Sequence, residues 1–300
     1  MLISVIIVNW NRVDDMKETL TSLEDQTNKN FEIVVVDNGS SDGSIEMIES
    51  NFQHVKLVRL DSNLGCEEGF NIGMQNSDGE IYFYLDSDAS LDKNVLEKVK
   101  KEFIKDKELG ILDPRIINPN NNLIINEPKH WPKKNAFTGC AAAIRSSVID
   151  KIGMRPSEYF IYSSEADLCL RTINAGYSIV HFEEIIAFHR ESPEKRLSDK
   201  FYYYFTRNGL WLIWKYYPLT AAISETFIHL IFNFYRSTVS LSPWYFFWGL
   251  AEGLIYFKKY ALDKRSPIEK YHEAKLYPPF SVFLSIISFK IKNIAVKNEV

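Results

Sequence analysis

Apolar runs of strand length alternate with amphipathic segments of helix length through the first third of the chain. The apolar runs predict buried strands at Ser4–Val8, Phe31–Val36, Val55–Arg59 and Ile81–Leu85. The segments between and after them predict helices at Asp14–Asp25, Ser44–Ser50, Glu67–Asn76 and Asp92–Lys105. Strands without polar alternation, each followed by a helix, indicate a sheet covered on both faces. The pattern therefore predicts a doubly wound, Rossmann-like α/β domain with a mostly parallel sheet, which we assign to residues 1–200.

Polar side chains follow the carboxyl end of each predicted strand. They occur at residues 9–11, 37–40, 61–63 and 86–88. Ligands of doubly wound sheets bind beyond the carboxyl ends of the strands. We therefore expect these side chains to gather at one edge of the sheet and to form its binding site.

The stretch YFYLDSDAS, residues 82–90, places Asp86 and Asp88 directly after a strand. Side chains two residues apart in an extended segment point to the same side, so the two carboxylates could converge on one cation or one ligand. The alternative is an Asx-type turn that ends the strand and caps a helix beginning near Leu91.

The pattern changes from about Phe201, where aromatic residues become frequent and lysines and arginines are interspersed. No stretch reaches 18 uninterrupted apolar residues, because Glu225, His229, Arg236 and Glu252 break the runs. Helices lying at a bilayer surface suit this composition. An aromatic-rich helical region packed on the sheet or on a second subunit suits it equally. We therefore expect residues 201–300 to be a membrane-associated or dimerisation region.

Composition narrows the class of protein and its compartment. The net charge of −4 gives no overall attraction to nucleic acid. Cys66, Cys140 and Cys169 form no CxxC pair, which argues against a zinc site or a disulfide framework and favours a reducing cytoplasm. The N-terminus predicts a first strand rather than a signal peptide. These features lead us to expect a cytoplasmic protein, peripheral at the inner face of the cell membrane.

Four stretches together resemble the glycosyltransferase family 2 enzymes, which have the GT-A fold. They are SVIIVNWNR, FEIVVVDNGSSDGS, NLGCEEGFNIGM leading into YLDSDAS, and YFIYSSEADLCLRTINAGY with a later AFHRES. The resemblance covers residues 3 to 210, and it is closest to rhamnosyltransferase- and galactofuranosyltransferase-like members. It implies an inverting, metal-dependent transfer of a sugar from a UDP-, dTDP- or GDP-sugar to a glycan or a lipid-linked acceptor.

The resemblance assigns donor binding to the predicted strand ends. Asp37 would accept the imide N–H of a pyrimidine base, with Asn9 and Asn11 framing the same pocket, whereas its alternative role is to cap the next helix. Asn63 and Gly65 would approach the donor, and Asp86 would lie near its ribose. Gly69 and Gly73 would also allow close backbone approach to the donor. For Asp42 we expect a helix cap.

Asp86 and Asp88 match the DxD motif of GT-A enzymes, which implies a Mg²⁺ or Mn²⁺ ion. A divalent cation accepts carboxylate and phosphate oxygens together and neutralises the charge of a departing diphosphate. Asp88 would be the direct ligand and Asp86 would lie nearer the ribose. His189 occupies the position of a metal-binding histidine, although a lone histidine after a strand is more often structural.

Glu165 falls at the catalytic-base position when DLCLR is aligned with the family pattern. An inverting transfer needs one base for the acceptor hydroxyl. Asp167 would be a structural acid, and the alternative role for Glu165 is a helix cap. The pattern has an acidic pair here, and Ser164 replaces its first acid. Glu67 and Glu68 are a further departure, because they stand where small or aromatic residues are common, and they put the accepted donor sugar in doubt.

Several other residues have less specific roles. Residues 138–145, TGCAAAIR, would line the sugar pocket or form a buried strand. His130 and Trp131 would stack on an acceptor sugar or belong to an exposed loop. Three arginines could hold phosphates or lie on the surface: Arg190, Arg196 and Arg207.

Two rival classes of protein remain open at this point. A sugar-1-phosphate nucleotidylyltransferase has a related domain, but it would need a Gly-rich basic loop where this chain has NWNRVDD, residues 9–15. A non-catalytic, membrane-associated scaffold could retain the fold. The set of Asp86, Asp88 and Glu165 argues against the scaffold.

Overall fold

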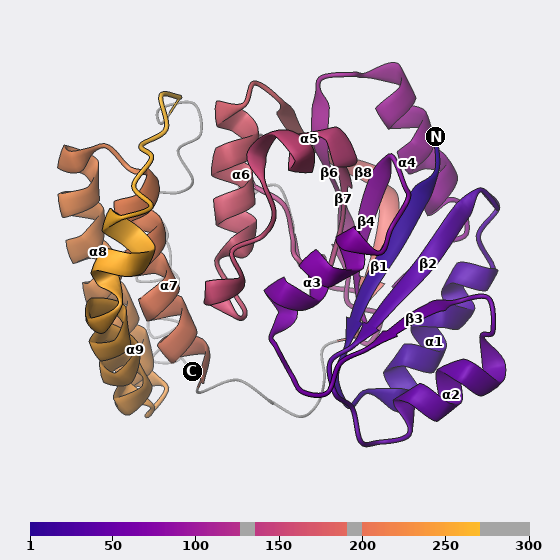
Figure 1. Ribbon diagram of the computed structural model, residues 1–300, viewed down its shortest axis with the longest axis horizontal. Coiled ribbons are helices and arrows are strands. Elements are labelled where there is room, and N and C mark those ends of the chain that lie inside the picture. The colour runs from indigo at the N-terminus through magenta and orange to yellow at the C-terminus, as the bar shows by residue number, and fades with distance from the viewer. Residues whose placement is uncertain (127–135, 191–199, 271–300) are drawn as a thin grey trace, which may run out of the picture. The chain divides into compact units, whose positions relative to one another are not determined.

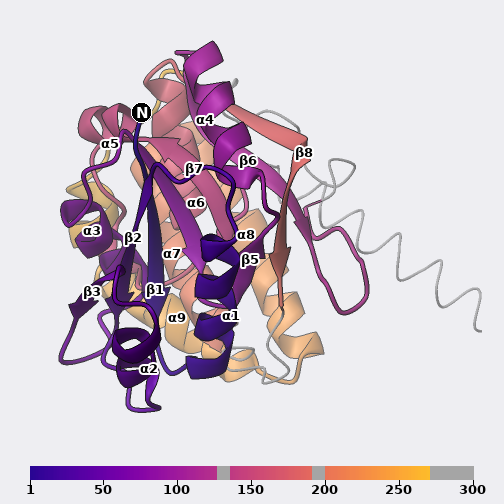
Figure 2. The same ribbon diagram turned by 90° about the vertical axis from the view of Figure 1, so that its right-hand side faces the viewer.

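The computed structural model describes residues 1–126, 136–190 and 200–270. The chain divides into two compact units, Met1–Arg196 and Leu197–Val300, and each is described by itself. The first unit is an α/β domain and the second is helical (Figures 1 and 2). The predicted functional division at residue 200 stays a prediction.

One mixed sheet of eight strands forms the centre of the first unit. Its order is β3-β2-β1-β4-β7-β6-β8-β5. β1, β2, β3 and β4 are parallel, as are β6 and β8, whereas β7 runs antiparallel between β4 and β6 and β5 runs antiparallel to β8. The strands are β1 Ile3–Asn9, β2 Phe31–Asp37, β3 Lys56–Arg59, β4 Ile81–Asp86, β5 Ala89–Leu91, β6 Leu109–Ile117, β7 Ala141–Arg145 and β8 Ser178–His189.

Helices cover both faces of this sheet, with α1, α2 and α4 on one face and α3, α5 and α6 on the other (Figure 1). Alternate residues of β1 explain the arrangement, because Ile3, Val5 and Ile7 pack into the core beneath α1 and α4 while Ile6 and Val8 face α3. The predicted α/β fold is therefore confirmed. The helices are α1 Val13–Glu24, α2 Ser44–Asn51, α3 Cys66–Gln75, α4 Val95–Lys105, α5 Ser146–Ile152 and α6 Ser164–Asn174, with a short 3-10 turn η1 at Ser157–Tyr159.

The structure corrects one predicted element. Residues 89–91 form the strand β5 rather than the start of a helix, and the next helix begins at Val95. Ala89 pairs with His189 and Leu91 pairs with Ala187 on β8. The strand that pairs with residues 89–91 therefore lies more than 90 residues later in the chain. A local pattern carries no information about such a partner. Asp86 and Asp88 therefore do not cap a helix at Leu91.

Three long helices and a π-helical turn form the described part of the second unit. They are α7 Lys200–Tyr216, α8 Leu219–Val239, α9 Pro243–Ile255 and the turn η2 Lys258–Leu262. The indole of Trp211 is fully buried and its Nε1 donates to the carbonyl of Gly253, 2.9 Å away, which joins α7 to α9. Pro218 precedes α8 and Pro243 opens α9, because proline breaks one helix and suits the first turn of the next.

Helix α8 buries polar side chains and exposes apolar ones. Its buried side includes four polar residues, Glu225, His229, Asn233 and Ser237. Its exposed side includes large apolar residues: Leu219, Ile223, Phe227, Ile231, Phe234, Tyr235 and Val239. Within the described ranges, none of the helices combines the length and the apolar composition that crossing a bilayer requires.

Candidate active site

The carboxyl ends of β1 and β2 form the first part of the site. Asn9 and Asp37 pair in register at the ends of the two strands, and the Asn9 side chain donates to Asp37 Oδ2 over 2.9 Å. The other carboxylate oxygen of Asp37 accepts the backbone N–H of Ser40 at 2.8 Å. Both side chains are fully buried. Asp37 therefore holds the turn after β2 and is not a cap of α2, which begins at Ser44.

Asparagine side chains order two loops beside these strand ends. Asn11 adopts a left-handed conformation, φ 53°, and its Oδ1 accepts the N–H of Ser41 at 2.8 Å. Asn63 Oδ1 accepts the N–H of Gly65 at 2.9 Å, just before α3. The structure therefore gathers the residues predicted to bind the donor, namely Asn9, Asn11, Asp37, Asn63 and Gly65, at one edge of the sheet. Their roles stay predictions.

Asp42 links the starts of two helices. One carboxylate oxygen accepts the N–H of Val13, the first residue of α1, at 2.9 Å. The other accepts the N–H of Ser44, the first residue of α2, at 3.1 Å. Burial opposes ionisation, but a hydrogen bond from the Ser44 hydroxyl and the two backbone bonds prevail and lower the pKa of Asp42 below its ordinary value. This arrangement agrees with the capping role that we expected.

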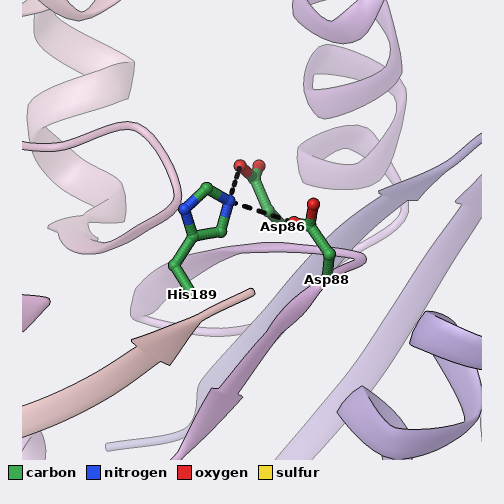
Figure 3. Close-up of side chains that lie close together, drawn as sticks. All are labelled: Asp86, Asp88 and His189. Atoms are coloured by element: carbon green, nitrogen blue, oxygen red, sulfur yellow. Dashed lines mark ion pairs between the residues drawn. The ribbon is translucent and has the colours of Figure 1, made fainter. Parts of the chain in front are cut away.

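Asp86, Asp88 and His189 come together at the end of β4 and β8 (Figure 3). The Nε2 atom of His189 lies 3.2 Å from Asp88 Oδ1 and 3.9 Å from Asp86 Oδ2. The pairing of Ala89 with His189 brings the histidine to the two aspartates, although it lies about a hundred residues later. Two carboxylates and an imidazole within 4.8 Å of one another are ligands that Mg²⁺ and Mn²⁺ accept. The chemistry of this group fits a divalent cation.

Arg12, which the sequence analysis did not select, also contacts this group. Its Nη1 atom lies 2.6 Å from Asp88 Oδ2. Although burial opposes ionisation, His189 and Arg12 prevail and lower the pKa of Asp88, whereas burial and the charge of Asp88 raise the pKa of Asp86. Asp88 is thus ionised more readily than Asp86. His189 and Arg12 already balance the charge of Asp88. The only sequence signal for Arg12 was its place directly after the polar end of the first strand.

Glu165 lies in the first turn of α6, with its side chain 28% exposed. The loop before it is strained, because Phe160, Tyr162 and Ser163 all have φ between 64° and 69°, where side chains are disfavoured. Strain of this kind collects at functional sites. A Cβ atom on Gly139 would lie 2.5 Å from Glu165 Oε1, so the carboxylate rests against bare backbone. Glycine at position 139 therefore leaves room for this carboxylate.

Asp167 has a structural role, as expected. It is fully buried, and its Oδ1 accepts from Arg171 Nε one helical turn later at 2.5 Å. Arg171 also donates to the carbonyls of Ile152, Gly153 and Met154. The pair therefore ties α6 to the end of α5.

The structure changes the interpretation of the glycines in α3. A Cβ atom on Gly69 would lie 2.6 Å from Val8, and one on Gly73 would lie 2.2 Å from Ile6. These glycines allow α3 to pack closely on β1, so the predicted approach to a donor is wrong for them.

The two glutamates that depart from the family pattern lie in different environments. Glu67 is buried and bonded to Arg155, whereas Glu68 is half-buried. Arg155 is a second residue that the sequence analysis missed.

The less specific candidates have mixed outcomes. Residues 141–145 form the buried strand β7, which was one of their two expected roles. Arg190 pairs with Glu18, and Arg207 pairs with Glu252 in the second unit, 2.9 Å away. Three candidates lie outside the described residues: His130, Trp131 and Arg196.

The fold is shared with glycosyltransferases of known structure. S. aureus TarS, residues 1–349, in complex with UDP-GlcNAc aligns with a TM-score of 0.64 and 15% identity, over 93% of both chains. A mannosyltransferase from Pyrobaculum calidifontis in complex with GDP-Man and Mn²⁺ aligns with a TM-score of 0.59 and 18% identity, over 96% of this chain and 80% of that one. At these identities the likeness shows the fold, which is GT-A.

Sequence similarity identifies the family. The model of "Glycosyl transferase family 2" matches residues 4–166, more than half of the chain, so the chain belongs to glycosyl transferase family 2. Glycosyltransferase AglE of Haloferax volcanii is 24% identical over 214 residues, which are 66% of this chain and 70% of AglE. Chondroitin synthase of Pasteurella multocida is 30% identical over 136 residues, 44% of this chain but only 14% of the synthase. The prediction of a glycosyltransferase enzyme is confirmed, whereas the rhamnosyltransferase-like subgroup stays a prediction.

Proposed function

We propose that the protein transfers a sugar from a nucleoside diphosphate donor to a hydroxyl of a glycan or lipid-linked acceptor, with inversion at the anomeric carbon. One observation carries this proposal. Gly139 lies against the Glu165 carboxylate, and the carbonyl of the next residue, Cys140, accepts the N–H of Asp86 at 2.8 Å. Residues 139 and 140 thus contact both the candidate base and one of the candidate metal ligands, which supports a reaction between them.

Glu165 would act as the general base. Its carboxylate takes the proton of the acceptor hydroxyl while that oxygen forms a bond to the anomeric carbon. The bond from this carbon to the diphosphate breaks on the opposite face, and the nucleoside diphosphate leaves with the electron pair. One back-side displacement inverts the centre once, so no second nucleophile is required.

The departing diphosphate needs positive charge beside it. Asp86, Asp88 and His189 would hold Mg²⁺ or Mn²⁺, which when bound neutralises the developing charge of the diphosphate. Arg12 lies 2.6 Å from Asp88 and would stay beside the same phosphates. Asp37, with Asn9 and Asn11, would select the base of a UDP-, dTDP- or GDP-sugar, and Asn63 and Gly65 would line the same side.

The test compares Glu165→Gln with the unchanged protein. We expect unchanged affinity for nucleoside diphosphate in calorimetry with Mn²⁺, and transfer reduced by about 10²–10⁴-fold. The anomer of the product, determined by NMR, should be inverted. Normal turnover in the variant would reduce Glu165 to a helix cap. Donor binding without any transfer or hydrolysis in the unchanged protein would favour the scaffold alternative.

We also propose that α8 and α9 bind the surface of a membrane, where a lipid-linked acceptor is presented. The exposed sides of both helices, within the described range 200–270, carry no charged residue and include Phe227, Trp244 and Trp248 at 60–70% exposure. Lys258 and Lys259 follow the end of α9 after two aromatic residues. Apolar and aromatic side chains with nearby lysines suit the interface of an anionic bilayer. This would place the enzyme at the inner face of the cell membrane.

Flotation with anionic liposomes tests the membrane proposal. The variant Phe227→Ser/Trp244→Ser should stay with the liposomes several-fold less than the unchanged protein, since each substitution removes a large apolar contact. A matched control, Tyr159→Phe, changes an aromatic residue that is buried in the first unit. Loss of a dimer in sedimentation, with unchanged flotation, would show instead that this surface joins two subunits.

A further inference from the structure

An ion pair with almost no solvent contact lies behind Glu165. Arg155, in the loop between α5 and η1, and Glu67, in the first turn of α3, are each 1% exposed at their side chains. The Arg155 Nε atom donates to Glu67 Oε2 over 2.6 Å. Burying two charges is costly unless the geometry is good and other bonds are made, so such a pair calls for an explanation.

Helix α3 holds Arg155 through its backbone and its side chain together. The Asn71 side chain accepts the Arg155 N–H and donates to the Arg155 carbonyl, each over 3.0 Å. The guanidinium carbon lies 4.7 Å from the ring centre of Phe70 and 4.9 Å from that of Tyr84 on β4. A planar cation that faces two adjacent rings and bonds to a carboxylate has little freedom to turn.

One edge of this guanidinium reaches the loop that carries the base. Its Nη2 atom donates to Ser164 Oγ at 2.9 Å and lies 3.4 Å from Glu165 Oε1. Ser164 is fully buried. Two acids thus share one cation, with a short contact to Glu67 and a long contact to Glu165. Ser164 stands at the position of the missing first acid, and it touches the same guanidinium as Glu67.

We propose that Glu67 supplies from α3 the carboxylate that the chain lacks at position 164, and that Glu67 and Arg155 together position Glu165. This inference rests on the proposed role of Glu165 as the base. Glu67 takes the strong bond of the guanidinium, so Glu165 is held in place by a weak contact and its carboxylate stays free to accept a proton. Glu67 and Arg155 are positioning residues, and neither is the base.

Removing the charge of Glu67 should change the chemistry of Glu165 in a defined direction. Among the residues that the structure describes, Glu165 would then be the one carboxylate that Arg155 contacts, and Arg155 would favour its ionised form. Within the described part of the chain, Glu165 also interacts electrostatically with Cys66 on α3, Asp86 on β4 and Cys169 on its own helix. The substitution leaves all three unchanged. A base held more firmly in its ionised form takes the acceptor proton less readily.

The experiment compares Glu67→Gln with Glu102→Gln. Glu102 is a half-buried carboxylate on α4, on the other face of the sheet, where it pairs with Lys105 at 3.6 Å, so it is a matched control. In Glu67→Gln we expect kcat to fall by between about 10- and 100-fold, the KM for donor to stay within a few-fold, and the acidic limb of the pH–rate profile to move to lower pH. The control should match the unchanged protein in all three.

A second variant tests whether Glu67 stands for the missing acid. Moving the carboxylate, in Glu67→Ala/Ser164→Glu, should recover most of the kcat that Glu67→Ala loses and return the pH profile toward that of the unchanged protein. If Glu67→Gln fails to fold, Glu67→Gln/Arg155→Met removes both charges together, which buried ion pairs tolerate. That folded variant should also have reduced kcat, with its acidic limb at higher pH than in the unchanged protein.

The outcomes separate this inference from the proposed function. If Glu67→Gln keeps kcat and the pH profile while Glu165→Gln abolishes transfer, the positioning role is wrong and the proposed function stands. If Glu67→Ala/Ser164→Glu folds and recovers no activity, Glu67 does not replace the acid at 164. If Glu165→Gln retains turnover, the proposed role of Glu165 itself is wrong.

Discussion

The two units of this chain distribute polar and apolar side chains in opposite ways. In the first unit, apolar residues such as Val5 and Phe83 fill the space between sheet and helices, and charged residues gather at the carboxyl edge of the sheet. In helix α8 of the second unit, His229 and Asn233 are buried, while Phe227 and Ile231 are more than 60% exposed. The first arrangement suits an enzyme facing water, and the second suits a surface that another apolar body covers.

One buried side chain from each unit shows a further difference, in charge. In the first unit Arg155 stays ionised, because Glu67 and Glu165 raise its pKa although burial opposes this. In the second unit burial lowers the pKa of His229 to about 4, so this side chain is neutral near pH 7. Arg155 therefore keeps its charge beside the proposed base, whereas His229 is neutral inside the helical unit. Four predictions test this contrast, from the largest expected effect to the smallest.

The largest effect should follow from Asp88→Ala. The variant loses the carboxylate shared by His189 and Arg12, and with it the expected holder of a divalent cation. We expect transfer to fall by about 10³-fold and nucleoside diphosphate binding to lose its dependence on Mn²⁺. Calorimetry with and without EDTA measures this. Mn²⁺-dependent binding that survives in the variant would contradict the assignment of the metal site.

A smaller loss should follow from Gly139→Ala. The new methyl group would lie 2.5 Å from Glu165 Oε1 and must displace the carboxylate. We expect about 10²-fold slower transfer with unchanged binding of nucleoside diphosphate. A shorter acid relieves the contact, so Gly139→Ala/Glu165→Asp should be faster than the product of the two single effects predicts. Strictly multiplicative losses would show that Gly139 does not act through Glu165.

The neutral His229 should make the second unit sensitive to acid. Its folded pKa of about 4 lies below its ordinary value of 6.5, so the unfolded chain binds the proton first. The contribution of His229 to stability is complete above pH 6.5 and is lost as the pH falls toward 4, by about 2 kcal/mol at pH 4.5. Thermal melts from pH 7 to 4.5 measure this. The variant His229→Gln should lose less stability over that range, and an equal loss would show that other groups carry the acid sensitivity.

The smallest effect should follow from Phe227→Ser. Because Phe227 is 65% exposed, the free energy of unfolding of the isolated protein should change by less than about 1 kcal/mol. The same substitution should lower the melting temperature clearly when anionic liposomes are present, since it removes stabilisation by binding. A large loss without liposomes would mean that Phe227 packs against the protein in solution.

Local patterns determined much of the first unit. The runs Ser4–Val8 and Ile81–Leu85 predicted two central strands within one or two residues, because burial on both faces leaves an uninterrupted apolar signal. Asp86, Asp88 and Glu165 were selected by motif, and Asp37 by its position at a strand end. For these residues, the order of elements along the chain is enough to place the side chain at the edge of the sheet.

The tertiary structure decided what depends on partners distant in sequence. Residues 89–91 form a strand only because β8 lies beside them, and the same pairing brings His189 to the aspartates. Glu67 and Arg155 are separated by 88 positions in the chain, and nothing in either neighbourhood specifies their contact. Sequence patterns report which face of an element is buried. The partner that a buried charge meets is set by the packing of whole elements, which is why the sequence marked Glu67 as a departure and only the structure paired it with Arg155.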